Sequence, residues 1–435
     1  MEQYTSANVE MAVLQFYYQG ASQETHQWLT NAQMSPAAWN FAWELLMPDK
    51  KPEVQFFGAS TIAIKVSKFW HEVPTDQNEA LRKRIIDTLT TYKGLRIVLT
   101  RLCVALASVV IKSIPGLWEK PIQDIMTIFR ENSTLLLEIL TVIPEEFSTQ
   151  AMPSPKRAAV RQELSQNLGN VMPLILHVIQ QPNQGEMTVQ AIKCLQAWVQ
   201  FGIPMEDTAP LVERLLMAIQ DEELFDCSLD AVSSIVSHPD THKYVNLLKG
   251  FLDQILKLEP FLGQLMSEGS YEMATPLVSL FVVFGETHSR MLIDWATADE
   301  TGRNLTVRLV RIILGVSSCN AQFPTQETIS EIPFGFWYIF QDDMIACDPP
   351  QFQVAIATFG PVYEELVNAL MRKAMYSLSE NEWTADQREA FRCYRTDIAD
   401  TIMYCYVSFI HFMPYAISAE HSNYRFCRTF YETTC

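Results

Sequence analysis

Residues 97–107 read Ile97-Val98-Leu99-Thr100-Arg101-Leu102-Cys103-Val104-Ala105-Leu106-Ala107, and they indicate the fold class most clearly. Apolar side chains in and just after this stretch recur every three or four residues, at Val98, Leu99, Leu102, Leu106, Val109 and Val110. This spacing places them on one face of an α-helix. The segments Ile192–Val199 and Leu211–Ile219 show the same pattern, and no segment alternates like a β-strand. The sequence therefore predicts an all-α protein.

The predicted helices come in pairs, with prolines at many of the breaks. A proline is tolerated in the first turn of a helix and stops a preceding one. Such prolines are Pro36, Pro52, Pro74, Pro121, Pro155, Pro210 and Pro239. Each pair is expected to begin near Val9, Pro36, Asp76, Pro121, Lys156, Pro210, Lys243, Leu305 and Val354. The mean spacing lies within the period of about 40–47 residues of HEAT and armadillo repeats.

A repeat of this kind changes what the chain length implies. The 435 residues would ordinarily suggest several globular domains. One amphipathic helix pair cannot bury its own apolar face, so stacked pairs form one continuous core. We therefore expect an α-α superhelix, a HEAT/armadillo-like solenoid of about nine to ten helical-hairpin repeats.

The charge balance restricts the partners of the chain. It has 32 Lys and Arg against 50 Asp and Glu, a net charge of −18. Binding to nucleic-acid phosphates needs an excess of basic residues, so direct nucleic-acid binding is not expected. The surface field favours basic partners instead.

The sequence offers no signal for catalysis, a cofactor or a metal. No nucleophile-elbow, P-loop, zinc-protease or dinucleotide motif is present, and the nine cysteines are scattered without C-x-x-C spacing. We expect no enzyme activity, no cofactor and no bound metal. The segment Met1–Asn8 does not resemble a secretory signal, and the longest apolar runs are too short to cross a membrane. An intracellular chain without membrane insertion is expected.

Several segments carry a resemblance to one family. The stretch Pro52-Glu53-Val54-Gln55-Phe56-Phe57-Gly58-Ala59-Ser60-Thr61-Ile62-Ala63-Ile64-Lys65, followed by Trp70, resembles the N-terminal domain of the importin-beta (karyopherin-beta) family. Further segments follow in the family's order: residues 74–77, 97–107, 140–147, 223–226, 336–343 and 394–401. The resemblance covers roughly residues 9–407 and implies a nuclear transport receptor, in a family whose members are longer than this chain.

The resemblance also implies partners and a division of the chain. It implies binding of Ran-GTP, of protein cargoes with basic surfaces and of nuclear pore FG-repeat proteins, with shuttling between cytoplasm and nucleus. Import is the expected activity, with export possible in addition. Residues 1–95 would be the N-terminal HEAT repeats that form the Ran-binding arch, and residues 96–406 would continue the same solenoid. Residues 407–435 form an aromatic and Cys-rich tail that departs from the family. This tail offers no polar cap, so we expect an exposed apolar end and self-association.

The candidate contacts follow from the resemblance and compete with plainer interpretations. Second helices are expected at Glu24–Ala32, Val54–Trp70 and Arg96–Ile111, with Lys65 and Arg101 as inner-face contacts. A solvated charge at a helix edge is the alternative for both. Acidic candidates for a basic partner are Asp342 and Asp343 at a helix end, with a solvated helix end as the alternative. Asp221 and Glu222 at a repeat turn are further candidates, but a solvated turn is the favoured interpretation of this pair.

Two alternative functions and one packing expectation complete the sequence-based prediction. A truncated isoform that binds Ran without a full cargo grip is the first alternative, and a generic HEAT-repeat scaffold or adaptor is the second. Aromatic residues at helical spacing are expected to be core residues. These are Trp28, Trp39, Trp43, Phe56, Phe57 and Trp70.

Overall fold

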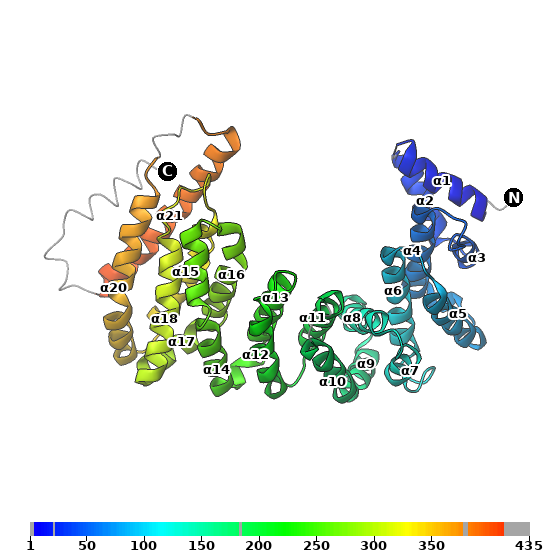
Figure 1. The fold of residues 1–435 in the computed structure, drawn as a ribbon, viewed down its shortest axis with the longest axis horizontal. Helices are drawn as coiled ribbons and strands as arrows, with labels where there is room; N and C mark the ends of the chain where they lie inside the picture. The colour runs from blue at the N-terminus through cyan, green and yellow to red at the C-terminus, as the bar shows by residue number, and fades with distance from the viewer. Residues whose placement is uncertain (1–3, 21, 182–184, 377–381, 413–435) are drawn as a thin grey trace. The chain divides into compact units, whose positions relative to one another are not determined.

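The computed structural model describes residues 4–20, 22–181, 185–376 and 382–412. Within these ranges the regular structure is helical, with α-helices α1–α21 and short 3-10 turns (Figure 1). The prediction of an all-α fold built from helical hairpins is confirmed. The helices form two compact units, which we call unit 1 (residues 1–203) and unit 2 (residues 204–435).

Unit 1 is a row of helical hairpins. Its helices are α1 Ser6–Tyr18, α2 Gln23–Met34, α3 Ala38–Glu44, α4 Pro52–Phe69, α5 Asn78–Thr91, α6 Arg96–Ser113, α7 Pro121–Ile128, α8 Ser133–Thr149, α9 Ser154–Gln166, α10 Leu168–Gln180 and α11 Gly185–Phe201. The second helices pack on one another in the order α4, α6, α8, α11, while α3, α5 and α10 pack against α4, α6 and α11. The predicted second helices coincide closely with α2, α4 and α6.

Unit 2 repeats the hairpin plan less evenly. Its helices are α12 Ala209–Ala218, α13 Phe225–Val236, α14 Val245–Leu256, α15 Glu259–Glu268, α16 Tyr271–Thr287, α17 Ser289–Ala298, α18 Glu300–Ser317, α19 Phe334–Ile345, α20 Pro349–Lys373 and α21 Ala385–Phe412. Helix α12 packs on α13, α17 on α18, and α19 and α20 on α21. Four helices, α14–α17, occupy the stretch between the starts predicted near Lys243 and Leu305, where one pair was expected.

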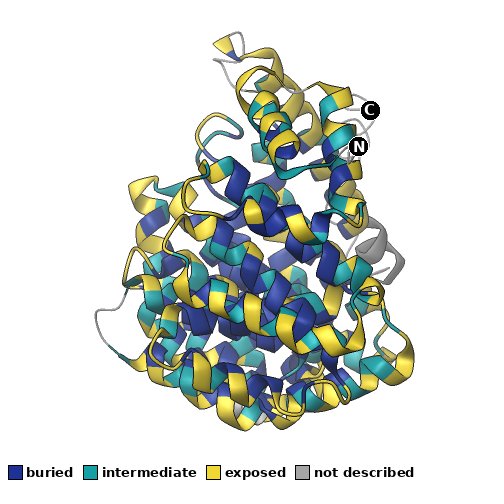
Figure 2. Cartoon of the chain, turned by 90° about the vertical axis from the view of Figure 1, so that its right-hand side faces the viewer, coloured by how far each residue is buried: buried dark blue, intermediate teal, exposed yellow. Residues whose placement is uncertain are grey.

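Apolar helix faces turned toward neighbouring helices form the core of each unit (Figure 2). In α6, the residues Val98, Leu102, Leu106 and Val109 are fully buried, as their spacing predicts. Each fully buried side chain of this size stabilises the fold by about 1.5–3 kcal/mol relative to an exposed one.

The predicted aromatic core needs correction. Trp43 is buried, but the other five aromatic residues of that prediction are only half-buried. The reason is visible at Trp39, whose indole Nε1 donates a 2.8 Å hydrogen bond to a carboxylate of Glu72. A tryptophan buries its apolar body while its polar edge stays near the surface.

Prolines occupy two kinds of position. Pro52, Pro121 and Pro210 lie in the first turns of α4, α7 and α12, as predicted. Pro144 instead lies inside α8, where it cannot donate to the carbonyl of Leu140 four residues earlier. Trp198 of α11 supplies the missing donor, because its indole Nε1 lies 3.0 Å from that carbonyl oxygen.

The C-terminal part of the chain is described only to residue 412. Helix α21 continues to Phe412, so its backbone enters the segment predicted as the departing tail, residues 407–435. Residues 413–435, on which the predictions of a missing cap and of self-association fall, lie outside the described residues.

Candidate functional site

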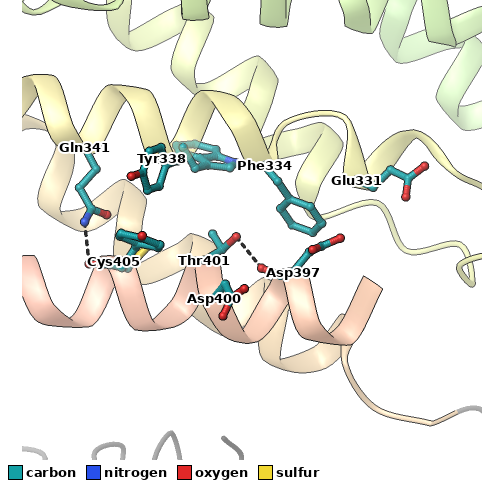
Figure 3. A pocket seen from close by; sticks show the side chains of 10 residues that line it. Glu331, Phe334, Tyr338, Gln341, Asp397, Asp400, Thr401 and Cys405 are labelled. Atoms are coloured by element: carbon teal, nitrogen blue, oxygen red, sulfur yellow. Dashed lines mark hydrogen bonds between the residues drawn. The ribbon is translucent and has the colours of Figure 1, made fainter. Parts of the chain in front are cut away.

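A groove between α19 and α21 gathers carboxylates and aromatic rings in unit 2 (Figure 3). Its volume is about 390 Å³. Helix α19 contributes lining residues that lie three or four positions apart, on one helix face. Helix α21 lies opposite and contributes lining residues at the same spacing. The lining residues are Glu331, Phe334, Trp337, Tyr338, Gln341, Asp397, Asp400, Thr401, Tyr404 and Cys405. We call this the α19–α21 groove.

Side-chain contacts fix the two walls of the groove. The Gln341 Nε2 donates a 2.6 Å hydrogen bond to the backbone carbonyl of Tyr404, which ties α19 to α21. The rings of Tyr338 and Tyr404 meet edge to face, with centroids 4.5 Å apart. Both rings are partly exposed and present their remaining surface to solvent at the groove. The groove therefore has fixed aromatic walls, which can hold a cation against a ring face.

The carboxylates in the groove repel one another. Burial, and then the neighbouring charges of Asp397 and Glu327, raise the pKa of Glu331. Burial and the charge of Asp400 raise the pKa of Asp397 in the same way. A raised carboxyl pKa means that negative charge is disfavoured there unless a cation is added. The groove is thus electrostatically suited to a lysine or arginine side chain.

The predicted acidic pair lies near the end of α19, which forms one wall of this groove, but neither residue lines the groove. Asp342 and Asp343 lie in the last turn of α19, as expected, with Asp342 exposed and Asp343 half-buried. The hydrogen bond between the Tyr338 and Tyr404 hydroxyls, and then the charges of Tyr404 and Asp342, raise the pKa of Tyr338. Asp342 therefore adds to the field of the groove. The backbone carbonyl of Asp343 accepts a 3.1 Å hydrogen bond from Arg290 of α17.

The structure places Lys65 in the core of unit 1, which corrects its prediction as an inner-face contact. Its side chain is 0% exposed, and its Nζ lies 2.5 Å from Glu72 Oε2. The ammonium also lies 4.3 Å from the ring centroid of Phe69 and 5.2 Å from that of Trp39. These aromatic faces and one carboxylate replace its hydration, so Lys65 cannot reach a partner without local unfolding.

Arg101 of α6 is exposed, and its role as an inner-face contact stays a prediction. Its guanidinium lies 5.5 Å from the ring centroid of Phe56 on the adjacent helix α4. A second groove, of about 430 Å³, crosses α6, α8 and α11 in unit 1. It is lined chiefly by polar residues, namely Arg96, Thr100, Glu138, Thr141, Val142, Glu145, Gln190, Lys193, Gln196, Ala197 and Gln200.

Asp221 and Glu222 occupy the turn between α12 and α13, and both are exposed. The Asp221 carboxylate accepts a 3.0 Å hydrogen bond from the backbone N–H of Glu223, so it stabilises the turn locally. The structure does not bring this pair together with the lining residues of the α19–α21 groove. Their role as partner contacts stays a prediction.

Within the described ranges, no three His, Cys, Asp or Glu side chains gather as a metal site. None of the helices in the described part of the chain has an apolar stretch long enough to span a bilayer.

Sequence reasoning missed most of the α19–α21 groove. Asp397 and Asp400 lie in segment 394–401 of the family resemblance but were not predicted as contacts, and Glu331 was not singled out. The signal that could have found them is a pair of matching stripes. Residues 334, 337, 338 and 341 repeat at the same intervals as residues 397, 400, 401 and 404.

Comparison with family profiles gives three matches in order along the chain. Residues 25–91 match the importin-beta N-terminal domain, residues 95–232 match exportin 1-like protein, and residues 376–408 match the importin 13 repeat. The last match includes the α21 side of the α19–α21 groove.

Individual proteins match over most of this chain. Importin-13 of Homo sapiens is 38% identical over 419 residues, which cover 93% of this chain and 43% of that protein. Importin-13 homolog A of Dictyostelium discoideum is 24% identical and covers 76% of this chain and 33% of the relative. The solved structure "Importin13 cytosolic state" has a TM-score of 0.70 and 27% identity, covering 82% of this chain and 42% of that one. The chain thus spans less than half the length of these relatives.

Stacked helical hairpins, with second helices packed on one another along a row, define a HEAT-repeat solenoid protein. The three ordered profile matches and the identity shared with importin-13 agree with this class. The chain belongs to the importin-beta family.

Proposed function

We propose that this chain acts as a nuclear transport receptor that binds Ran-GTP and a protein cargo and shuttles between cytoplasm and nucleus. The observation that carries the proposal is the 38% identity to human importin-13 over 93% of the chain. The profile match at residues 25–91 supports Ran binding through unit 1, in the region first assigned to the Ran-binding arch. Protein import is the proposed direction of transport. Nuclear pore FG-repeat proteins are the proposed partners during passage.

The α19–α21 groove is the proposed contact for a basic cargo. Its raised carboxyl pKa values would return toward the ordinary range when a lysine or arginine side chain enters. The ring faces of Tyr338 and Tyr404 would pack against the alkyl stem and charge of that side chain. Asp342 near the end of α19 would strengthen the attraction and speed encounter.

A pull-down with purified chain and Ran tests the central claim. The chain is incubated with Ran loaded with GTP or with GDP, and bound Ran is quantified at physiological salt. Clear preference for the GTP form is expected. Equal recovery of both forms would overturn the transport proposal and favour a generic HEAT-repeat scaffold. Preference for Ran-GTP without retention of any basic cargo would favour the isoform that binds Ran without a full cargo grip.

A charge reversal tests the groove separately. The variant Asp397→Lys/Asp400→Lys should weaken binding of a lysine-rich peptide by at least about tenfold, because like charges then face each other. Asp386→Lys is the matched control, since Asp386 lies exposed in the first turn of the same helix and outside the groove. Fluorescence anisotropy with a labelled peptide gives both affinities. An equal effect of the two variants would show that net charge, and not the groove, binds the peptide.

A further inference from the structure

Arg96, the first residue of α6, contacts two further helices of unit 1. Its Nη1 donates to Glu186 Oε1 at 2.5 Å, and its Nη2 donates to Gln190 Oε1 at 2.8 Å. Both acceptors lie on α11. The Nη2 also lies 3.4 Å from Glu138 Oε2 on α8. We call these three contacts the Arg96 clasp.

The clasp skips one repeat. Helix α6 packs on α8 and α8 packs on α11, so Arg96 reaches past its neighbour to the second helix along the row (Figure 1). Arg101, five residues later on α6, instead contacts Phe56 on the adjacent helix α4. When a row of stacked helices bends, the spacing between the first and third helix changes more than that between neighbours. A contact between α6 and α11 therefore responds to curvature more than ordinary packing does.

The acceptors of the clasp are held in place by other side chains. The Thr100 hydroxyl donates a 2.9 Å hydrogen bond to Glu138 Oε1. Gln190 Nε2 donates a 3.2 Å hydrogen bond to the buried hydroxyl of Thr141 on α8. Arg96 therefore meets two acceptors whose orientation is already fixed, which lowers the entropy lost on forming the clasp.

We propose that the Arg96 clasp is a reversible latch on the curvature of unit 1, and that a basic partner in the neighbouring groove releases it. Arg96, Glu138 and Gln190 all line that groove. A lysine or arginine from a partner would compete with Arg96 for Glu138 and Glu186. Occupation of the groove and opening of the latch are therefore linked equilibria. The latch stands on the contacts within unit 1 and does not depend on the proposed transport function.

The exposure of the clasp suits a reversible device. The side chains of Arg96 and Glu186 are 51% and 74% exposed. Ion pairs this exposed are individually weak and are screened by salt. A small differential affinity is then enough to shift the balance between closed and open forms.

A distance measurement in the full chain tests the latch. Nitroxide labels on unnatural residues replace two exposed residues outside the groove, Lys68 on α4 and His177 on α10, the helix that packs against α11. Electron–electron double resonance gives their distance distribution. In Arg96→Met the open population should rise about fivefold, with a longer mean distance. Raising the salt concentration from about 0.05 to 0.5 M should move the parent chain in the same direction and leave Arg96→Met unchanged.

Two further variants make the result specific. Glu186→Gln removes an exposed acceptor and leaves α6 and α8 unaltered, so it should open the latch in part even if Arg96→Met disturbs folding. Arg101→Met removes the same charge from the same helix and should leave the distance unchanged. A lysine-rich peptide should lengthen the distance in the parent chain. The latch is refuted if the distribution in Arg96→Met and Glu186→Gln matches that of the parent chain at low salt.

Discussion

The buried ion pair of unit 2 gives the sharpest test of how this fold is held. Lys373, the last residue of α20, places its Nζ 2.5 Å from Glu327 Oε1, 2.8 Å from the carbonyl oxygen of Ala321 and 3.1 Å from that of Cys319. The Glu327 side chain is 0% exposed and that of Lys373 is 10% exposed. These contacts anchor the connection between α18 and α19, which carries Glu331 to the α19–α21 groove.

The expected cost of breaking this pair follows from its burial. Lys373→Met leaves the Glu327 carboxylate buried without its cation, which costs about 3–5 kcal/mol. The two hydrogen bonds that Glu327 accepts from the backbone and hydroxyl of Ser330, at 2.9 and 2.7 Å, offset only part of this loss. Lys373→Met/Glu327→Gln removes both charges and should cost clearly less than the single change.

Hydrogen exchange measures this cost locally. Opening free energies convert at about 1.4 kcal/mol per tenfold in rate, so amides in residues 322–332 should exchange about 150- to 5,000-fold faster in Lys373→Met. Arg311→Met is the control, because the pair of Arg311 with Glu365 joins side chains that are 45% and 53% exposed and should matter little. An increase below about tenfold, or an equal increase in the double variant, would refute the assignment of this pair as a buried anchor.

Two further predictions concern close packing and thiol chemistry. A Cβ on Gly285 of α16 would lie 2.7 Å from the Phe336 ring, so Gly285→Ala should destabilise unit 2 by about 1–3 kcal/mol. A Cβ on Gly315 of α18 would meet nothing within 4 Å, so Gly315→Ala should stabilise α18 by up to about 1 kcal/mol. Calorimetric Tm shifts of the same sign for both would contradict this. Burial raises the pKa of the Cys405 thiol to about 12, so iodoacetamide at pH 8 should modify exposed Cys393 and spare Cys405 in the native chain. Mass spectrometry reads the sites, and equal modification would show that Cys405 is accessible.

The sequence predicted those helices whose apolar spacing and end signals lie within the helix itself or next to it. The second helix at Arg96–Ile111 differs from α6, Arg96–Ser113, by one turn or less at one end, because its apolar spacing and its flanks are both visible in the sequence. The helices α14–α17 disturb the regular repeat because their boundaries depend on packing among themselves and against α18 and α19. The mean spacing of the predicted helix pairs does not reveal a local departure from the regular repeat.

The candidate site was predictable only in part. Asp342 and Asp343 could be placed at a helix end, since an aromatic run precedes them. The α19–α21 groove joins residues that lie far apart in sequence, so its shape arises only when the two helices pack. Lys65 was misplaced because a lysine at a helix edge is usually solvated. Here Trp39, Phe69 and Glu72 together surround its charge.

The backbone carbonyl of Leu140 in α8 depends on a residue from a later hairpin for its hydrogen bond. Pro144 leaves that oxygen without its helical donor, and Trp198 of α11, the third helix after α8, supplies one. Helix α8 is therefore completed by a residue that is synthesised later and belongs to the following hairpin. A fragment that ended between α8 and α11 would expose a buried carbonyl with no partner for its lone pairs. Anyone dividing this chain into expressible pieces should keep residues 133–201 together.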